Sequence, residues 1–373
     1  MTKEIETFLL GFEKPSTQRI YRGHLNTFFQ NIKADPEHYF DNGRDYQQDL
    51  LDFWISLKEY APCTRSGKIT AIKQFMEEND VIISRKTWNI IKRQKKAIPR
   101  TIDHVPTPQE LKSILTHGGV KEKALFLVMA SSGIRIDEAL SITINDVKLR
   151  DEKGDIISPA MIKIRQEVSK NDTPRITFIS DESRDILIEW LKIREDYLVA
   201  LVEKLAKRNM SKELKDNRVF PYAWSTAWNM WTRMLHKSKL DKRDTSRKMM
   251  QSTPKKSNAR FEIHLHTLRK FFMNRMKGVT RIDAVEQLAG HEGYLDRSYR
   301  RLEEAELIEA YKQGMPSVTI FNNAPDLSGI NESLKQKDKD IAEMKEENQR
   351  LRNHLQDFEM EMRKLLREKD KKD

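Results

Sequence analysis

Residues 131–140 read Ser131-Ser-Gly-Ile-Arg135-Ile-Asp-Glu138-Ala-Leu140, and they follow an apolar stretch from Ala124 to Ala130. An apolar stretch of this kind predicts a buried helix. Two β-like stretches come next, at 161–167 and 175–179, with Asn-Asp and Pro as turn signals between them. The pattern predicts a small antiparallel sheet in a mixed domain, with Lys170 at or beside the tip of a hairpin.

Helical segments surround the predicted hairpin. Thr107-Pro108-Gln109-Glu110 combines an N-cap hydroxyl, a proline at the first helical position and a glutamate placed to close a capping box. Long helices are expected at 183–208, 223–237 and 266–277. Apolar residues of the segment 1–90 recur at three- and four-residue intervals, which predicts a small all-helical domain. The expected fold class is therefore mainly α with a small antiparallel β-sheet, an α+β protein.

The composition points to a polyanionic partner. Lys and Arg number 68 against 57 Asp and Glu, which gives a net charge of +11 and favours nucleic acid. Apolar runs long enough to span a membrane are absent from the sequence, as is a signal-peptide pattern at the N-terminus. Cys63 is the single cysteine, so an intrachain disulfide and a cysteine-based zinc site are both excluded. These features predict a cytoplasmic protein with no membrane partner.

Basic residues gather in two places that suit phosphate binding. The segment 91–104 is rich in lysine and arginine and ends near a proline, so it resembles an interdomain linker that could track a phosphate backbone. Arg65 and Lys68 lie near a predicted helix start, where cations and hydroxyls suit phosphate. Solvated charge and plain helix capping are the alternatives. The candidate DNA-binding residues are Arg65, Lys68, Lys92, Arg93, Lys95 and Lys96.

The last segment, 322–373, carries a heptad repeat. Leu334, Ile341, Asn348, Leu355 and Met362 occupy every seventh position, and a second apolar series includes Met344, Leu351, Phe358 and Leu365. Such a repeat predicts a coiled coil, and a lone asparagine in the first series favours a parallel dimer in one register. The alternative is a single amphipathic helix that packs on its own domain.

Three sequence boxes and a tyrosine follow one another along the chain. The first is Ser-Gly-Ile-Arg135-Ile-Asp-Glu138-Ala-Leu, the second His264-Leu-His266-Thr-Leu-Arg269-Lys270, and the third Leu288-Ala-Gly-His291. Tyr299 follows the third box in the stretch Leu295-Asp-Arg-Ser-Tyr299-Arg-Arg. Together they resemble the tyrosine recombinase (phage integrase) family. The motifs cover roughly 101–320, and the flanks look most like integrases of archaea and mobile elements. Residues 1–90 match only in general character.

The resemblance implies a role for each matching residue. Tyr299 would be the nucleophile, Arg135 and Arg269 the phosphate clamp, His266 and His291 partners of the phosphoryl oxygens, and Lys170 the general acid. Glu138 lies three positions after Arg135 and is expected to support it. Tyr294 is a competing tyrosine, only three positions after His291. The implied reaction forms a 3′-phosphotyrosine link and requires no metal or other cofactor.

The resemblance also predicts the organisation and function of the whole chain. A helical core-binding domain would cover 1–90, a basic linker 91–104, a catalytic domain 105–321, and a linker with the coiled-coil tail 322–373. The expected function is site-specific recombination of double-stranded DNA, in integration, excision or transposition of a mobile element. The protein would form a dimer through the tail and a tetramer on paired sites. A catalytically inactive, zipper-dimerised DNA-binding regulator and a type IB topoisomerase are the alternatives.

Overall fold

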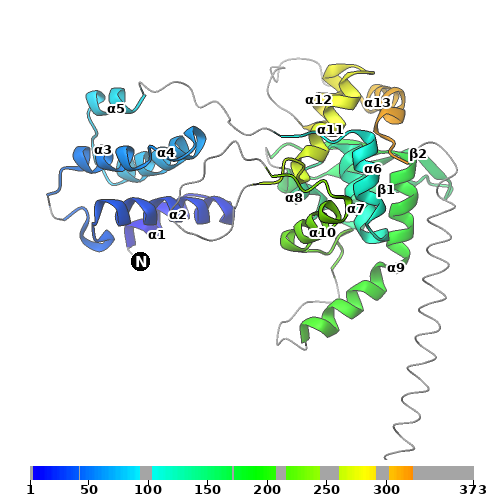
Figure 1. Cartoon of the computed structure of the whole chain (residues 1–373), viewed down its shortest axis with the longest axis horizontal. Coiled ribbons are helices and arrows are strands. Elements are labelled where there is room, and N and C mark those ends of the chain that lie inside the picture. The colour runs from blue at the N-terminus through cyan, green and yellow to red at the C-terminus, as the bar shows by residue number, and fades with distance from the viewer. Residues whose placement is uncertain are drawn as a thin grey trace, which may run out of the picture. The chain divides into compact units, whose positions relative to one another are not determined.

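The computed structural model describes residues 3–41, 43–92, 103–169, 172–206, 216–243, 260–290 and 302–321. The chain divides into two compact units (Figure 1). Unit 1 comprises Met1–Asp103 with Lys242–Glu262, and unit 2 comprises His104–Asp241 with Ile263–Asp373. The predicted domain boundaries stay predictions, and the coiled-coil segment lies outside the described residues.

Unit 1 is helical. Its helices are α1 (Lys3–Leu10), α2 (Pro15–Ile32), α3 (Tyr46–Ser56), α4 (Pro62–Glu78) and α5 (Arg85–Lys92), with a short 3-10 turn at Pro36–His38. The core is largely aromatic: Phe8, Phe28, Phe53 and Phe75 are buried, and Phe28 meets Phe53 edge to face at 5.1 Å. Edge-to-face ring pairs stabilise a core beyond the burial of their apolar area.

Unit 2 contains the predicted small antiparallel sheet. Its strands are β1 (Val147–Arg150), β2 (Ile156–Ile164) and β3 (Arg175–Ile179), in the order β1-β2-β3. Antiparallel pairing joins Met161 to Phe178 and Ile162 to Val147. The sheet and the mainly helical class are therefore confirmed.

The prediction for the middle strand was wrong in its bounds. A strand was expected at 161–167, but β2 ends at Ile164 and a 3-10 turn (Gln166–Val168) follows it. The strand also begins earlier, at Ile156, although Pro159 has no backbone N–H to donate to a neighbouring strand. Pairing with β1 is irregular between Lys148 and Arg150, and such an irregular stretch tolerates a proline that cannot donate. The short strand β1 was not predicted.

The helices of unit 2 are α6 (Pro108–Thr116), α7 (Val120–Ser132), α8 (Ile136–Ala139), α9 (Asp181–Ala206), α10 (Trp224–Ser238), α11 (Leu265–Lys277), α12 (Ile282–Ala289) and α13 (Glu304–Val318). The capping box at Thr107 is confirmed. The Glu110 backbone N–H donates to the Thr107 hydroxyl at 3.2 Å, and the Thr107 N–H donates to the Glu110 carboxylate at 2.8 Å.

Helix α7 lies in the core of unit 2. Its residues from Ala124 to Ser132 are buried, and α9, α11 and β3 pack around it (Figure 1). The buried Tyr311 hydroxyl of α13 donates to the Ser131 carbonyl at 2.8 Å, so α13 is fixed to the end of α7. Within the described ranges, every helix is too short or too polar to cross a membrane.

Candidate active site

The end of helix α7 and the start of α8 carry the first sequence box. Gly133 ends α7 in the left-handed region, with φ of +67°, and Arg135 caps α8. A Cβ atom on Gly133 would lie 2.3 Å from Phe272 of α11, so the turn requires glycine for both its conformation and its packing. This close approach brings the α7–α8 turn against α11, the helix that carries Arg269.

Glu138 lies at the centre of the site and is almost fully buried. Its Oε1 accepts from Arg135 Nη1 at 3.0 Å and from Arg175 Nη1 at 3.2 Å. Its Oε2 accepts from the Arg135 backbone N–H at 2.8 Å and from Arg175 Nη2 at 2.7 Å. Burial alone raises the pKa of Glu138, but hydrogen bonds and charge from Arg175, and then from Arg135, bring it below its ordinary value. Glu138 is therefore an ionised, fully hydrogen-bonded carboxylate.

Arg269 is a buried cation with a donor left over. Its Nη1 donates to the carbonyls of Gly133 and Ala289, each at 2.6 Å. Among the described residues its buried Nη2 has no hydrogen-bond partner. Burial, followed by the charges of Arg135 and Arg175, lowers the pKa of Arg269 to about 10. The guanidinium is thus still charged at neutral pH, and an unsatisfied charged donor is costly unless an anion accepts from it.

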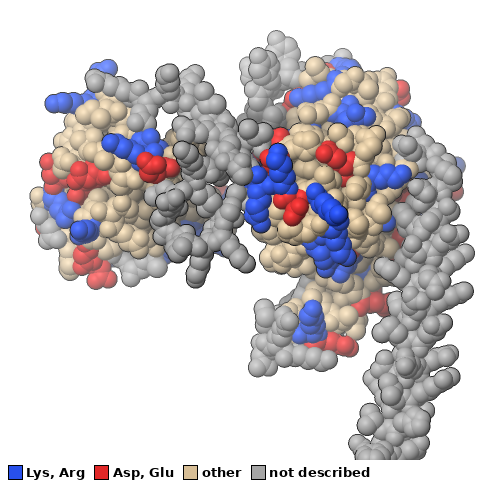
Figure 2. Space-filling view, in the orientation of Figure 1, with Lys and Arg blue, Asp and Glu red and all other residues tan. Residues whose placement is uncertain are grey.

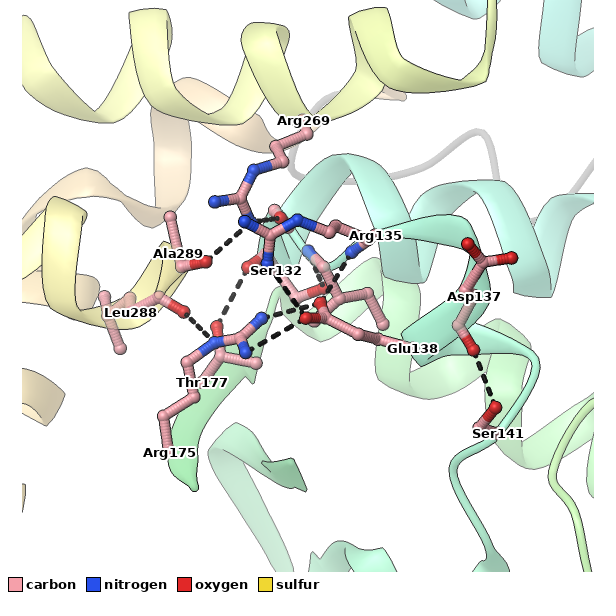
Figure 3. Close-up of polar contacts among 12 residues, drawn as sticks. Ser132, Arg135, Asp137, Glu138, Ser141, Arg175, Thr177, Arg269, Leu288 and Ala289 are labelled. Atoms are coloured by element: carbon pink, nitrogen blue, oxygen red, sulfur yellow. Dashed lines mark hydrogen bonds and ion pairs between the residues drawn. The ribbon is translucent and has the colours of Figure 1, made fainter. Parts of the chain in front are cut away.

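Two guanidinium groups contact the Glu138 carboxylate, and that of Arg269 lies close by. Arg135 caps α8, Arg175 belongs to β3 and Arg269 to α11, and their head groups converge near Glu138 (Figure 3). The excess of positive charge lies in a partly buried setting, where charge is screened less than at the surface. Arginine forks bind tetrahedral oxyanions bidentately, so the arrangement suits a phosphate group.

The structure places some predicted site residues together and leaves others outside the described ranges. Arg135, Glu138 and Arg269 share one site. His266 lies in the first turn of α11 with an exposed side chain, and its backbone N–H donates to Nδ1 of the buried His264 at 3.2 Å. Lys170, His291 and Tyr299, together with the competing Tyr294, lie outside the described residues. Their catalytic roles stay predictions.

The candidate DNA-binding residues of unit 1 have unexpected surroundings. Arg65 and Lys68 are more than nine-tenths buried in α4, rather than exposed at a helix start. The Arg65 guanidinium lies 3.9 Å from the centre of the Trp54 ring, and Lys68 donates to the Thr27 hydroxyl at 3.1 Å. Burial lowers the pKa of both groups. Arg93, Lys95, Lys96 and the Lys92 side chain lie outside the described residues.

Arg175 is the residue that the sequence reasoning missed. It is the first residue of β3, its side chain is only 7% exposed, and it pairs with Glu138, 37 positions earlier in the chain. A partner that distant leaves no periodic signal. The available hint was an arginine opening an otherwise uncharged strand directly after a turn, where a charged side chain needs a partner once it is buried.

The face of unit 2 drawn in Figure 2 shows no single dominant charge. On the face drawn in Figure 2, lysine and arginine side chains of unit 2 form several groups with acidic side chains between them. Within the described ranges, His, Cys, Asp and Glu side chains form no group of three or more that could hold a metal ion.

Fold and site together define a mainly helical protein with a small antiparallel sheet and a cluster of three arginines around one buried carboxylate. The family model described as "Phage integrase family" matches residues 94–295, which is more than half of the chain. The chain therefore belongs to the phage integrase family, and the resemblance seen in the sequence is confirmed.

Curated relatives and a solved structure agree with this assignment. The chain is 24% identical over 214 residues to the tyrosine recombinase XerC of Roseiflexus castenholzii, which covers 53% of this chain and 63% of that protein. It is 23% identical over 235 residues to the XerC of Vibrio campbellii, over 62% of this chain and 63% of that protein. The chain thus spans less than two thirds of the length of these relatives. A lambda integrase dimer bound to a COC′ core site shares the fold, with a TM-score of 0.51, 12% identity and coverage of 81% of this chain and 79% of that one.

Proposed function

We propose that this chain is a site-specific tyrosine recombinase that cuts and rejoins double-stranded DNA. The observation that carries the proposal is Arg269, a buried guanidinium beside Arg135 with one donor unused among the described residues. A scissile phosphate would supply the missing acceptor. Membership of the phage integrase family, in which curated relatives are named tyrosine recombinases, supports the same reaction.

In the proposed reaction, the Tyr299 phenolate oxygen attacks the phosphorus, and the bond to the 5′ oxygen of the next nucleotide breaks. The product is a 3′-phosphotyrosine link and a 5′ hydroxyl. Lys170 would donate the proton that the leaving oxygen takes, while His266 and His291 would hold phosphoryl oxygens. Arg135 and Arg269 would stabilise the charge on the non-bridging oxygens, where loss of one such donor typically costs about 3 to 4 kcal/mol of transition-state stabilisation. Attack by the 5′ hydroxyl reverses the steps.

The proposal extends to partners and setting. Residues 1–90 and the linker residues Lys92, Arg93, Lys95 and Lys96 would hold the DNA backbone beside the catalytic domain. The protein would act as a dimer and then a tetramer on paired sites. The setting would be integration, excision or transposition of a mobile element. The lambda integrase of the matching fold is a dimer on a core site, which supports an oligomer on DNA here.

A selection of covalent adducts from a pool of DNA sequences tests the reaction and finds the target at the same time. The full-length protein is incubated with duplexes that carry a nick and randomised flanks, and complexes that survive denaturation are recovered and sequenced. We expect wild-type adducts that share a common sequence, none from Tyr299→Phe, and a loss of at least about 100-fold in Arg269→Lys. Arg275→Lys is the matched control, because Arg275 lies on the same helix and its Nε donates to the Ser317 carbonyl at the surface.

The outcomes separate the proposed recombinase from the inactive regulator, and Tyr299 from another nucleophile. Wild-type protein that yields bound but never covalent DNA would favour the inactive regulator. Adducts that persist in Tyr299→Phe would show that another residue is the nucleophile, and Tyr294 would be the first to test.

A further inference from the structure

Arg175 binds three acceptors on two separate elements. Its Nη1 and Nη2 donate to the two oxygens of Glu138 at 3.2 and 2.7 Å, as a bidentate fork. Its Nε donates to the Leu288 carbonyl, at the end of α12, at 3.1 Å. The side chain also packs on Gly290, where an added Cβ would lie 2.8 Å from its Cδ and Nε. Figure 3 shows the hydrogen bonds of Arg175 to Glu138 and to the Leu288 carbonyl.

The contacts distinguish Arg175 from Arg135 and Arg269, the two arginines proposed to hold the phosphate. Every nitrogen of the Arg175 guanidinium already donates to the protein, and the side chain is 7% exposed. Arg269 keeps an unused Nη2 among the described residues, and Arg135 gives only Nη1 to Glu138. Arg175 is therefore poorly placed to touch a substrate.

The same contacts limit the number of hydrogen bonds that Glu138 can accept from Arg135. A carboxylate has about four acceptor positions, and Arg175 fills two of those on Glu138. The Arg135 backbone N–H and Nη1 fill the other two. Without Arg175, Arg135 would be the only cation paired with the buried Glu138 carboxylate. Since bidentate pairing is the favoured geometry between arginine and a carboxylate, the Arg135 fork would turn inward and away from a phosphate.

Arg175 also acts on the end of α12. It holds the Leu288 carbonyl, and Arg269 holds the next carbonyl, Ala289. The last carbonyls of a helix have no acceptor role within the helix, so these two arginines satisfy them and fix the helix end. A shift of this end would displace one of the two carbonyls that orient Arg269.

We infer that Arg175 is a positioning residue that keeps Arg135 and Arg269 available to an oxyanion, by saturating Glu138 and by holding the end of α12. The inference rests on the proposed function only where it concerns DNA cleavage. Binding of a simple tetrahedral anion depends on the arginine geometry alone.

Tungstate, a tetrahedral dianion, is the probe, and its affinity for the full-length protein is measured by calorimetry. We expect Arg175→Met to weaken tungstate binding about 10-fold, because contacting charged groups couple by energies of this order. Adding Glu138→Gln to Arg175→Met should restore most of the affinity, since a neutral amide does not draw Arg135 inward. Arg175→Lys should lose affinity by a smaller factor, because an ammonium keeps the charge but cannot fill both oxygens of Glu138.

Arg194→Met is the matched control for loss of a buried arginine. Arg194 is 2% exposed, and its Nε donates to the Arg218 carbonyl at 2.8 Å, away from Glu138. We expect it to lower the melting temperature and to leave tungstate affinity within about twofold. Should Arg175→Met fail to fold, Arg175→Lys carries the test.

Three results would overturn the inference. They are a wild type that binds no tungstate, Arg175 variants that bind it as tightly as the wild type does, and an affinity that adding Glu138→Gln fails to recover. Strand cleavage on the duplex recovered from the selection should follow the same order among variants, with DNA affinity within about threefold of wild type. A wild-type protein that binds tungstate in this order but never forms an adduct overturns the proposed function alone.

Discussion

Two glycines set the geometry of the site at the scale of single residues. Gly133 and Gly290 end α7 and α12 with φ of +67° and +64°, and Arg269 donates to the carbonyls of Gly133 and Ala289. Both positions also lack room for a side chain, because Phe272 lies over the first and Arg175 over the second. The backbone turns that present carbonyls to Arg269 thus depend on residues without a Cβ.

Gly290→Ala is expected to disturb the site as well as the backbone. The added Cβ would meet Arg175 at 2.8 Å and would also strain a left-handed residue. We predict a stability loss of about 1 to 2 kcal/mol, together with tungstate binding weakened several-fold. Denaturant unfolding and calorimetry measure the two effects.

Gly154→Ala is the control for backbone strain alone. Gly154 has φ of +90°, and an added Cβ there would meet no atom within 4 Å. It should lower stability with tungstate affinity unchanged. Equal effects of the two variants on tungstate would contradict a specific contact between Gly290 and Arg175.

Local spacing could predict part of the site and not the rest. Arg135 and Glu138 are three positions apart, so their contact follows from one helical turn. The Arg175 pairing with Glu138 joins a strand to a helix start 37 positions away, and only the folded chain brings them together. Arg65 and Lys68 show the reverse case. Their charge suggested an exposed surface, but aromatic and hydroxyl partners allow both to be buried in α4.

At the scale of elements, strong local signals predicted several helices, among them α6, α9, α10 and α11, but not the short strand β1. The capping box at Thr107 marks the start of α6 because the N-cap and the third helical residue satisfy each other's backbone donors. β1 has four residues of alternating partial burial, too few for a periodic pattern to stand out. Its existence depends on pairing with β2, which is a tertiary contact.

The chain that leaves helix α13 is held by one carboxylate. Glu182, at the start of α9, accepts from the backbone N–H groups of Ile320 at 2.6 Å and Phe321 at 2.9 Å. The Phe321 ring lies near the ammonium groups of Lys112 and Lys123, at 5.8 and 5.7 Å. Glu182 therefore ties the end of the described chain to the body of unit 2.

Glu182→Gln should loosen this attachment. A glutamine offers one acceptor and turns an amide N–H₂ toward the other backbone donor, and an unsatisfied buried donor costs about 1 to 3 kcal/mol. We predict amide hydrogen exchange at Ile320 and Phe321 at least about 10-fold faster than in the wild type. Glu189→Gln, on the exposed side of α9, should leave both rates unchanged. Equal rates in both variants would contradict the role of Glu182.

The same attachment should depend on pH. Burial raises the pKa of Glu182 above 4.5, although the two backbone donors and Lys112 oppose the shift. The attached state then binds a proton more tightly than the open state. Protonation removes the buried charge and leaves acceptor capacity on both oxygens, whereas the amide nitrogen in Glu182→Gln cannot accept. Its stabilisation is complete below the ordinary pKa of 4.5 and is lost as pH rises through the raised pKa. Protection factors at Ile320 and Phe321 should therefore fall with rising pH in the wild type and stay level in Glu182→Gln.

At the scale of the whole molecule, the net charge of +11 and the heptad segment bear on the proposed assembly of copies of the chain on DNA. An excess of cations would concentrate the protein on duplex DNA in a salt-dependent manner. A paired tail would raise the effective concentration of a second catalytic domain without contributing to catalysis. Both effects would favour assembly on paired sites over the action of single copies.

Leu351→Lys should separate the dimer if residues 322–373 form the proposed parallel coiled coil. Leu351 occupies a core position of the heptad and Asn353 an outer one, so Asn353→Lys adds the same charge outside the interface. We expect sedimentation without DNA to give a dimer for the wild type and for Asn353→Lys, and a monomer for Leu351→Lys. Because a lysine pair in a hydrophobic seam leaves two charges without partners, the effect should exceed that of any outer substitution. A wild-type monomer, or two variants that behave alike, would instead favour a tail that packs on its own domain.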